Sequence, residues 1–117
     1  MTFDPDFDSK PDSEIRSEFA GDPDMQEIIE MFVQDMPERI SQLQNSWQTG
    51  EFEMVKRVAH QLKGASGGYG FSVLGTAASE LEQGVKALAS NTEDSQFVQV
   101  KTQLDALVEI CRRVSAK

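Results

Sequence analysis

The chain contains a single histidine, His60, and its neighbours in the sequence give it a distinctive chemical environment. At helical spacing, the residues one turn before and after it are Lys56, Arg57, Lys63 and Gly64. A neutral imidazole is a good nucleophile, and nearby cations disfavour its protonation. A phosphoryl group on the ring would bring about two negative charges, which Lys63 could meet from the next turn. The spacing is therefore suited to carrying a phosphoryl group.

The segment around His60 is predicted to be one helix, residues 51–68, with the histidine turned away from the core. At roughly 100° per residue, His60 lies about 140° from Val55 on the helical wheel. The opposite, buried face is made of Val55, Val58, Ala59, Leu62 and Ser66.

Glycines follow the histidine along the same helix. Gly64 costs roughly 1 kcal/mol relative to alanine inside a helix, and it removes side-chain bulk one turn from His60, so another protein could approach closely. Gly67 and Gly68 follow one turn later. Two simpler interpretations remain open: His60 is an ordinary solvated residue, and Gly67 and Gly68 mark fraying into a loop.

Composition excludes several other functions. The single histidine and the single cysteine, Cys111, exclude a multi-histidine or cysteine-cluster metal centre and an internal disulfide framework. No apolar run of about 18 residues is present, which argues against a membrane span. The sequence also lacks a Gly-rich phosphate loop with its lysine and a nucleophile–base pair, so an enzyme active site is not expected. We expect no metal and no cofactor of its own.

The net charge of −9 is concentrated at the N-terminus. Residues 1–30 hold ten acidic residues against two basic ones, whereas the rest of the chain holds ten against nine. No basic stripe is available to neutralise phosphates, so nucleic acid is not an expected partner. The prolines and acidic residues of the start predict a disordered acidic leader over residues 1–12.

The remaining residues, 13–117, are predicted to form an all-α antiparallel four-helix bundle. A short extra helix is expected over residues 13–21, ended by Gly21. Asp22 and Pro23 then start a helix that we expect to be continuous over residues 23–48, with a kink near Pro37. The third helix carries His60, Ser72 is expected to cap the fourth, and the last is expected to run to the C-terminus with its apolar stripe, including Phe97, Cys111 and Val114, toward the core.

The stretch from His60 to Gly70, HQLKGASGGYG, resembles the H-x-L-K-G-(S/A)…G motif of histidine-containing phosphotransfer (HPt) domains. The resemblance extends over about residues 23–115. It implies a four-helix bundle in which the epsilon nitrogen of His60 accepts a phosphoryl group from a receiver-domain aspartate, or donates one to it. It further implies that Lys63 assists and that Gly64 gives clearance to the docking receiver. Glu82 and Lys86 match positions that are often Gln or Glu and a basic residue in relatives, and by this resemblance we expect them to orient the imidazole or contact phosphate.

The partners that this resemblance implies are response-regulator receiver domains and a hybrid sensor histidine kinase, with the receiver supplying Mg²⁺. Lys56, Arg57 and Gly67 complete the expected supporting residues. We expect a cytoplasmic monomer that docks its partner on the face around His60 and on the neighbouring turns of the first two helices.

Three alternatives stay open at this point. The first is a helical adaptor that binds a partner without phosphorylation. The second is an HPt module excised from a larger sensor kinase, although the chain ends without dimerisation or ATP-binding domains, which favours a freestanding carrier. The weakest is a metal site in which Glu53 and Glu82 join His60.

Overall fold

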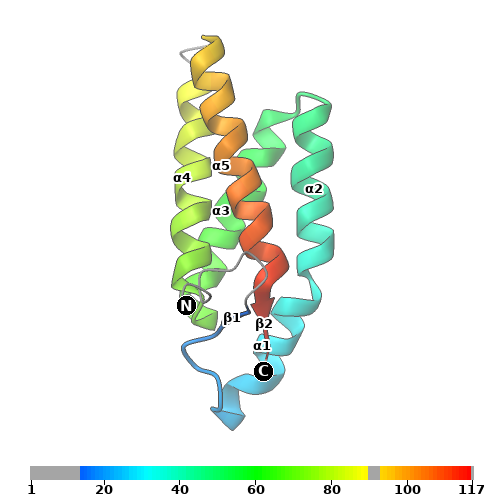
Figure 1. Ribbon diagram of the computed structural model, residues 1–117. Helices are drawn as coiled ribbons and strands as arrows, with labels where there is room; N and C mark the ends of the chain where they lie inside the picture. The colour runs from blue at the N-terminus through cyan, green and yellow to red at the C-terminus, as the bar shows by residue number, and fades with distance from the viewer. Residues whose placement is uncertain (1–13, 90–92, 117) are drawn as a thin grey trace, which may run out of the picture.

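The computed structural model describes residues 14–89 and 93–116 and consists of helices with one pair of very short strands (Figure 1). In chain order the elements are β1 (Ile15–Arg16), α1 (Pro23–Gln34), α2 (Met36–Gln48), α3 (Phe52–Tyr69), α4 (Ser72–Leu88), α5 (Asp94–Arg113) and β2 (Val114–Ser115).

Four of the helices, α2 to α5, form the predicted bundle. Helix α3 packs against α2 and α4, and α5 packs against α2 and α4, so the four helices close a ring around one core. Helix α1 lies at one end of this bundle, where it contacts α2, α3 and β2 (Figure 1). The prediction of an all-α four-helix bundle is confirmed.

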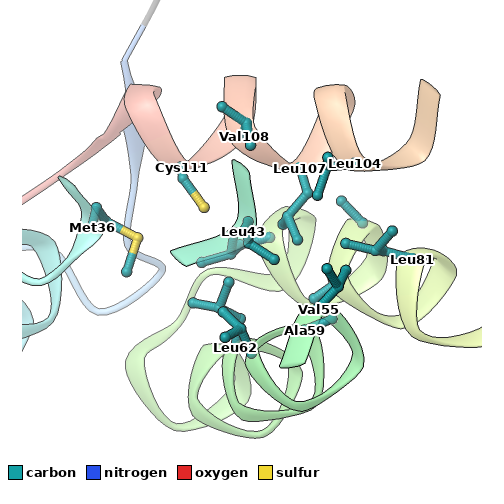
Figure 2. Packing of buried hydrophobic residues seen from close by; sticks show 14 of the residues in the cluster. Met36, Leu43, Val55, Ala59, Leu62, Leu81, Leu104, Leu107, Val108 and Cys111 are labelled. Atoms are coloured by element: carbon teal, nitrogen blue, oxygen red, sulfur yellow. The ribbon is translucent and has the colours of Figure 1, made fainter. Parts of the chain in front are cut away.

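Leucine and valine side chains from all four helices meet in the middle of the bundle (Figure 2). They come from one face of each helix, as the apolar periodicity of the sequence predicts. Those with at most 1% of their surface exposed include Leu43, Val55, Leu62, Leu74, Leu81, Leu104 and Leu107. The tight packing of these faces fixes how each helix is rotated about its axis, and therefore which side chains of α3 face solvent.

Cys111 belongs to this core, as predicted. Its side chain is 2% exposed, and burial raises the pKa of its thiol to about 12. Phe97, which the sequence places on the same stripe of α5, is instead 42% exposed. It packs beside Trp47 and Phe52, with ring centroids 4.9 and 6.1 Å away, and so closes the end of the bundle far from α1.

The first predicted long helix is in fact two helices, which corrects the expectation of one kinked helix over residues 23–48. Asp22 and Pro23 start α1 as predicted, and the Asp22 carboxylate accepts a hydrogen bond from the Asp24 amide at 2.9 Å. Asp35 lies between the two helices, although its N–H still donates to the Met31 carbonyl at 3.2 Å and its carbonyl accepts from the Arg39 N–H at 3.1 Å. Pro37 is the cause of this interruption, because its ring offers no N–H to the carbonyl four residues earlier and crowds the turn before it.

The short helix predicted over residues 13–21 is wrong. Ile15 and Arg16 form β1, which pairs in parallel with β2 at the C-terminal end of the chain. For the same reason the last helix ends at Arg113 and does not run to the C-terminus, since Val114 and Ser115 are extended. A segment of this length forms a marginal helix in isolation, so pairing with a distant strand decides its conformation.

Residues 14–22, which we call the N-terminal strap, also close over the connection between α3 and α4. The Ser17 hydroxyl donates to the Tyr69 carbonyl at 2.6 Å, and the Glu18 amide donates to the Gly70 carbonyl at 2.8 Å. Ser72 is the first residue of α4 and not its cap, and its hydroxyl donates to the Glu18 carboxylate at 2.5 Å. The predicted leader, residues 1–12, lies outside the described residues.

Candidate functional site

His60 lies in the middle of α3, on the side that faces solvent. Its side chain is 68% exposed, whereas the neighbouring Ala59 and Leu62 are at most 1% exposed in the core. The orientation predicted from helical periodicity is therefore correct. The bundle holds the helix backbone rigidly beneath the ring and leaves the ring itself accessible.

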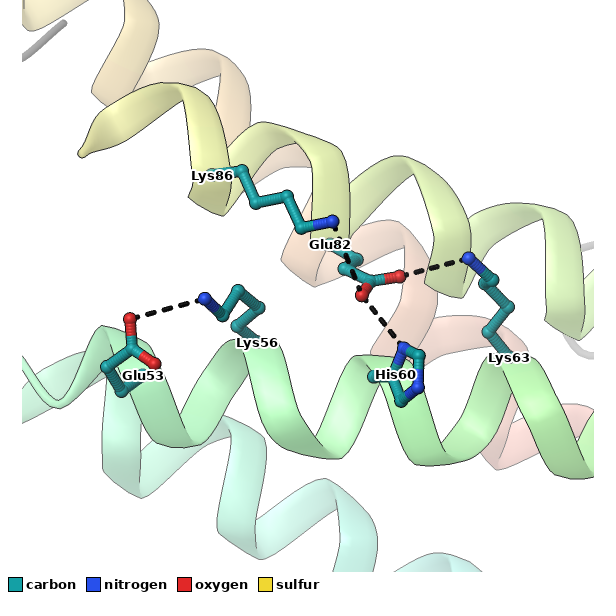
Figure 3. A network of polar contacts seen from close by, with 6 residues as sticks. All are labelled: Glu53, Lys56, His60, Lys63, Glu82 and Lys86. Atoms are coloured by element: carbon teal, nitrogen blue, oxygen red, sulfur yellow. Dashed lines mark hydrogen bonds and ion pairs between the residues drawn. The ribbon is translucent and has the colours of Figure 1, made fainter. Parts of the chain in front are cut away.

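A buried carboxylate on the adjacent helix holds the imidazole in place. Glu82, on α4, is only 5% exposed, and its Oε2 atom lies 2.9 Å from Nδ1 of His60. Lys63 reaches the other carboxylate oxygen, with Nζ 3.2 Å from Oε1, and Lys86 places its Nζ 3.8 Å from Oε2. The two lysines reach the carboxylate from opposite sides, Lys63 from α3 and Lys86 from α4 (Figure 3).

The charge of Glu82 determines which nitrogen of His60 carries the proton. Burial acts to raise the pKa of the Glu82 carboxyl, but hydrogen bonds from His60 and Lys63, together with the positive charge of Lys63, bring it below its ordinary value. Glu82 is therefore ionised near neutral pH and can only accept hydrogen bonds. Nδ1 must then be the donor, so in the neutral ring Nε2 is unprotonated and has a free lone pair.

Of the three basic residues expected near His60, which are Lys56, Arg57 and Lys63, none has its charged group in contact with the imidazole. Lys63 lies beside the histidine, but its ammonium group contacts Glu82. The ammonium group of Lys56 lies 3.3 Å from the Glu53 carboxylate, one turn further away from the ring. Arg57 is exposed on the same helix. The charged group in direct contact with the imidazole is thus a carboxylate.

The glycines of α3 leave its outer surface bare next to His60. A Cβ atom built on Gly64 or Gly67 would have no heavy atom within 4 Å, apart from the helix's own neighbouring backbone. Neither glycine is therefore needed for packing inside this chain. An open groove between α3 and α4 begins beside Lys63 and passes Gly67 and Thr76. This surface has the shape that a close-approaching partner requires.

The structure gives Glu82 a more central place than reasoning from the residues alone had given it. The signal in the sequence was a glutamate flanked by the apolar face of α4, next to Leu81 and one turn before Lys86. A second contact was missed altogether: Arg39 of α2 donates to the side chain of Gln61 at 2.8 Å, next to His60. This contact ties the outer face of α3 to α2.

The alternative of a metal site is not supported. Glu53 binds Lys56 and does not approach His60 (Figure 3). Within residues 14–89 and 93–116, no group of three or more histidine, cysteine, aspartate or glutamate side chains could hold a metal ion. Over the same residues, no helix has the length and apolar character needed to cross a membrane.

Comparison with known proteins matches the chain to a family. The family model described as "Hpt domain" matches residues 27–110, which is most of the chain and includes α2, α3, α4 and all of the site. No curated protein and no solved structure matches the chain. On the family match, together with the bundle and the exposed histidine, the chain belongs to the Hpt domain family.

Proposed function

We propose that this chain is a phosphorelay carrier in which His60 accepts a phosphoryl group from a receiver-domain phosphoaspartate and passes it to another receiver aspartate. Membership of the Hpt family implies histidine phosphotransfer in phosphorelay signalling, by proteins that carry the group and have no ATP site of their own. The observation that carries the proposal is the orientation of the ring. Glu82 holds Nδ1, so the exposed Nε2 is the nucleophile.

The transfer step balances without any proton leaving His60. The lone pair of Nε2 attacks phosphorus, the P–N bond forms, and the P–O bond to the receiver aspartate breaks. The aspartate leaves as a carboxylate and takes back the electron pair. Because Nδ1 keeps its proton, the ring becomes formally cationic, and the Glu82 carboxylate 2.9 Å away stabilises that charge.

Lys63 is the residue proposed to meet the phosphoryl oxygens. It lies one turn after His60 on α3, and its side chain is 42% exposed, so its ammonium group can move from Glu82 toward a group on Nε2. The Mg²⁺ that neutralises the phosphoryl group in the receiver would come from the receiver itself. In this proposal the chain supplies the acceptor atom, its orientation and one mobile cation.

The bare surface of α3 is proposed as the docking site for the receiver. Gly64 and Gly67 allow close approach beside His60. Ile28 and Met31 of α1 are 41% and 62% exposed and form an apolar surface on α1. They flank Phe32, whose ring packs against Tyr69 at the end of α3 with centroids 4.7 Å apart. Such apolar side chains beside open backbone fit the apolar face of a partner helix.

A receiver labelled on its aspartate provides the decisive experiment. The wild-type chain and His60→Gln would be incubated with the phosphorylated receiver and Mg²⁺, and the label on each chain measured after acid and alkali treatment. We expect an acid-labile, alkali-stable label on the wild type only. The glutamine amide can still donate a hydrogen bond to Glu82, so His60→Gln should stay folded, which circular dichroism checks.

Labelling of His60→Gln as well as the wild type would mean that another residue carries the phosphoryl group. Failure of the wild type with a panel of receivers and with a hybrid sensor kinase would favour the adaptor function. An adaptor should bind its partner equally well with and without His60→Gln. The proposed carrier acts in the cytoplasm. It is proposed to be a monomer, which sedimentation of the unmodified and phosphorylated chain would test.

A further inference from the structure

His60, Lys63 and Lys86 contact the Glu82 carboxylate at different distances and through different oxygens, and this difference matters when His60 is phosphorylated. Lys63 is the closer lysine and has Oε1 to itself, at 3.2 Å. Lys86 is further away, at 3.8 Å, and shares Oε2 with His60. The buried Glu82 carboxylate therefore faces two ammonium groups. Lys63 is within hydrogen-bonding distance, and Lys86, one helical turn after Glu82 on α4, is slightly further away.

We propose that Lys86 is a positioning residue: it remains with Glu82 when Lys63 leaves the carboxylate for the phosphoryl group on His60. This inference rests on the proposed phosphotransfer function and adds a second lysine with a separate role. Lys86 does not touch the phosphoryl group, and it acts through Glu82.

The need for such a residue follows from the burial of Glu82. Its side chain is only 6% exposed, so water has little access to replace a lost partner. Leaving a buried carboxylate without its cation is unfavourable, and this opposes any movement of Lys63. Lys86 lies one turn further along the same helix as Glu82, and its side chain is 51% exposed, so it can approach without disturbing the core.

The geometry also explains why two separate lysines are useful. The ring keeps its contact with Oε2 throughout, because Lys63 releases only Oε1. Lys63 and Lys86 reach Glu82 from opposite sides (Figure 3), so Lys63 can leave while Lys86 moves closer. The carboxylate then retains Lys86 and the cationic phosphohistidine ring as its partners, and the phosphoryl group gains Lys63.

The test is a double-mutant cycle on the phosphorylation equilibrium with a labelled receiver and Mg²⁺. Lys86→Gln should lower the ratio of phosphorylated to free chain about two- to fivefold, a range typical of partly exposed ion pairs. Lys86→Arg should restore it. In a Lys63→Gln background, Lys86→Gln should have almost no further effect, because no lysine is left to be released.

A matched control is available on α5. Lys101 forms an ion pair with Asp105 at 2.8 Å, also between residues four apart, and is similarly exposed. Lys101→Gln should leave the equilibrium unchanged. The ¹⁵N signal of the Lys63 ammonium group gives an independent readout. It should shift on phosphorylation of the wild type and much less in Lys86→Gln.

The possible results distinguish failure of the proposed function from failure of the role of Lys86. No label on the wild type overturns the proposed function itself. A labelled wild type with an unaltered Lys86→Gln, an equal loss in both backgrounds, or no restoration by Lys86→Arg overturns the role of Lys86 alone. An equal loss in both backgrounds would mean that Lys86 acts on the phosphoryl group or on its partner directly.

Discussion

The Nδ1 atom of His60 lies 2.9 Å from the Oε2 atom of Glu82, which is almost entirely buried between α3 and α4. This pair makes an exposed side chain rigid and defined in its tautomer. An isolated histidine on a helix surface would rotate freely and would present either nitrogen to a partner.

Lys63→Ala should slow phosphotransfer about tenfold, because a charge-assisted hydrogen bond to the phosphoryl oxygens is lost. The variant should stay folded but lose some stability, because the buried Glu82 carboxylate loses its hydrogen-bonded cation. Rates measured at limiting receiver concentration, with Lys101→Ala as a control, test this prediction. A variant that transfers as fast as the wild type would remove Lys63 from the mechanism.

Gly64→Ala should separate stability from function. The new methyl group meets no atom within 4 Å, so the helix should gain up to about 1 kcal/mol of stability. Phosphotransfer should nevertheless become slower, and Gly64→Gln should slow it further, because the added bulk lies where the receiver docks. Urea unfolding and transfer rates are the two measurements. If both variants transfer at the wild-type rate, the receiver docks elsewhere.

The contribution of Glu82 to stability should depend on pH in a defined direction. Its pKa is below the ordinary value of 4.5, so the folded state favours the ionised form. The resulting stabilisation is complete above about pH 4.5 and is lost as the pH falls through the lowered pKa of the folded state.

Glu82→Gln removes this carboxyl and keeps every other titrating group, so at acidic pH, where His60 and the lysines are charged in both proteins, the comparison reports on Glu82. As the pH falls below about 4.5, the difference in unfolding free energy between wild type and variant should shift against the wild type. Urea unfolding at a series of pH values measures it. A difference that stays constant down to about pH 3 would contradict the ionised, paired state of Glu82.

Gly70→Ala should destabilise the chain more than Gly50→Ala. Both glycines have positive φ, 80° and 76°, so alanine costs about 1 kcal/mol at either position for backbone reasons alone. Only at Gly70 would the new Cβ meet the N-terminal strap, at 2.6 Å from the Ser17 hydroxyl oxygen and 3.0 Å from the Glu18 amide nitrogen. Thermal unfolding of the two variants compares them directly. Equal losses would show that the strap contributes little to stability.

The sequence alone determined the parts of the molecule that depend on a local period. Apolar residues three and four apart defined α3, α4 and the bundle class, and the same period placed His60 on the exposed face of α3. Asp22 and Pro23 marked the start of α1 for an equally local reason, since a capping carboxylate and a fixed φ act within one turn.

Only the tertiary structure decided what depends on contacts between distant residues. Ile15 and Arg16 become a strand because the C-terminal end of the chain lies beside them, and no local preference encodes that neighbour. Glu82 lies 22 residues from His60, and its contact depends on how α3 and α4 are rotated and shifted against each other. Core packing fixes that relation, so the contact itself, to Nδ1 and from a buried carboxylate, is established by the fold, although the family resemblance had already singled out Glu82.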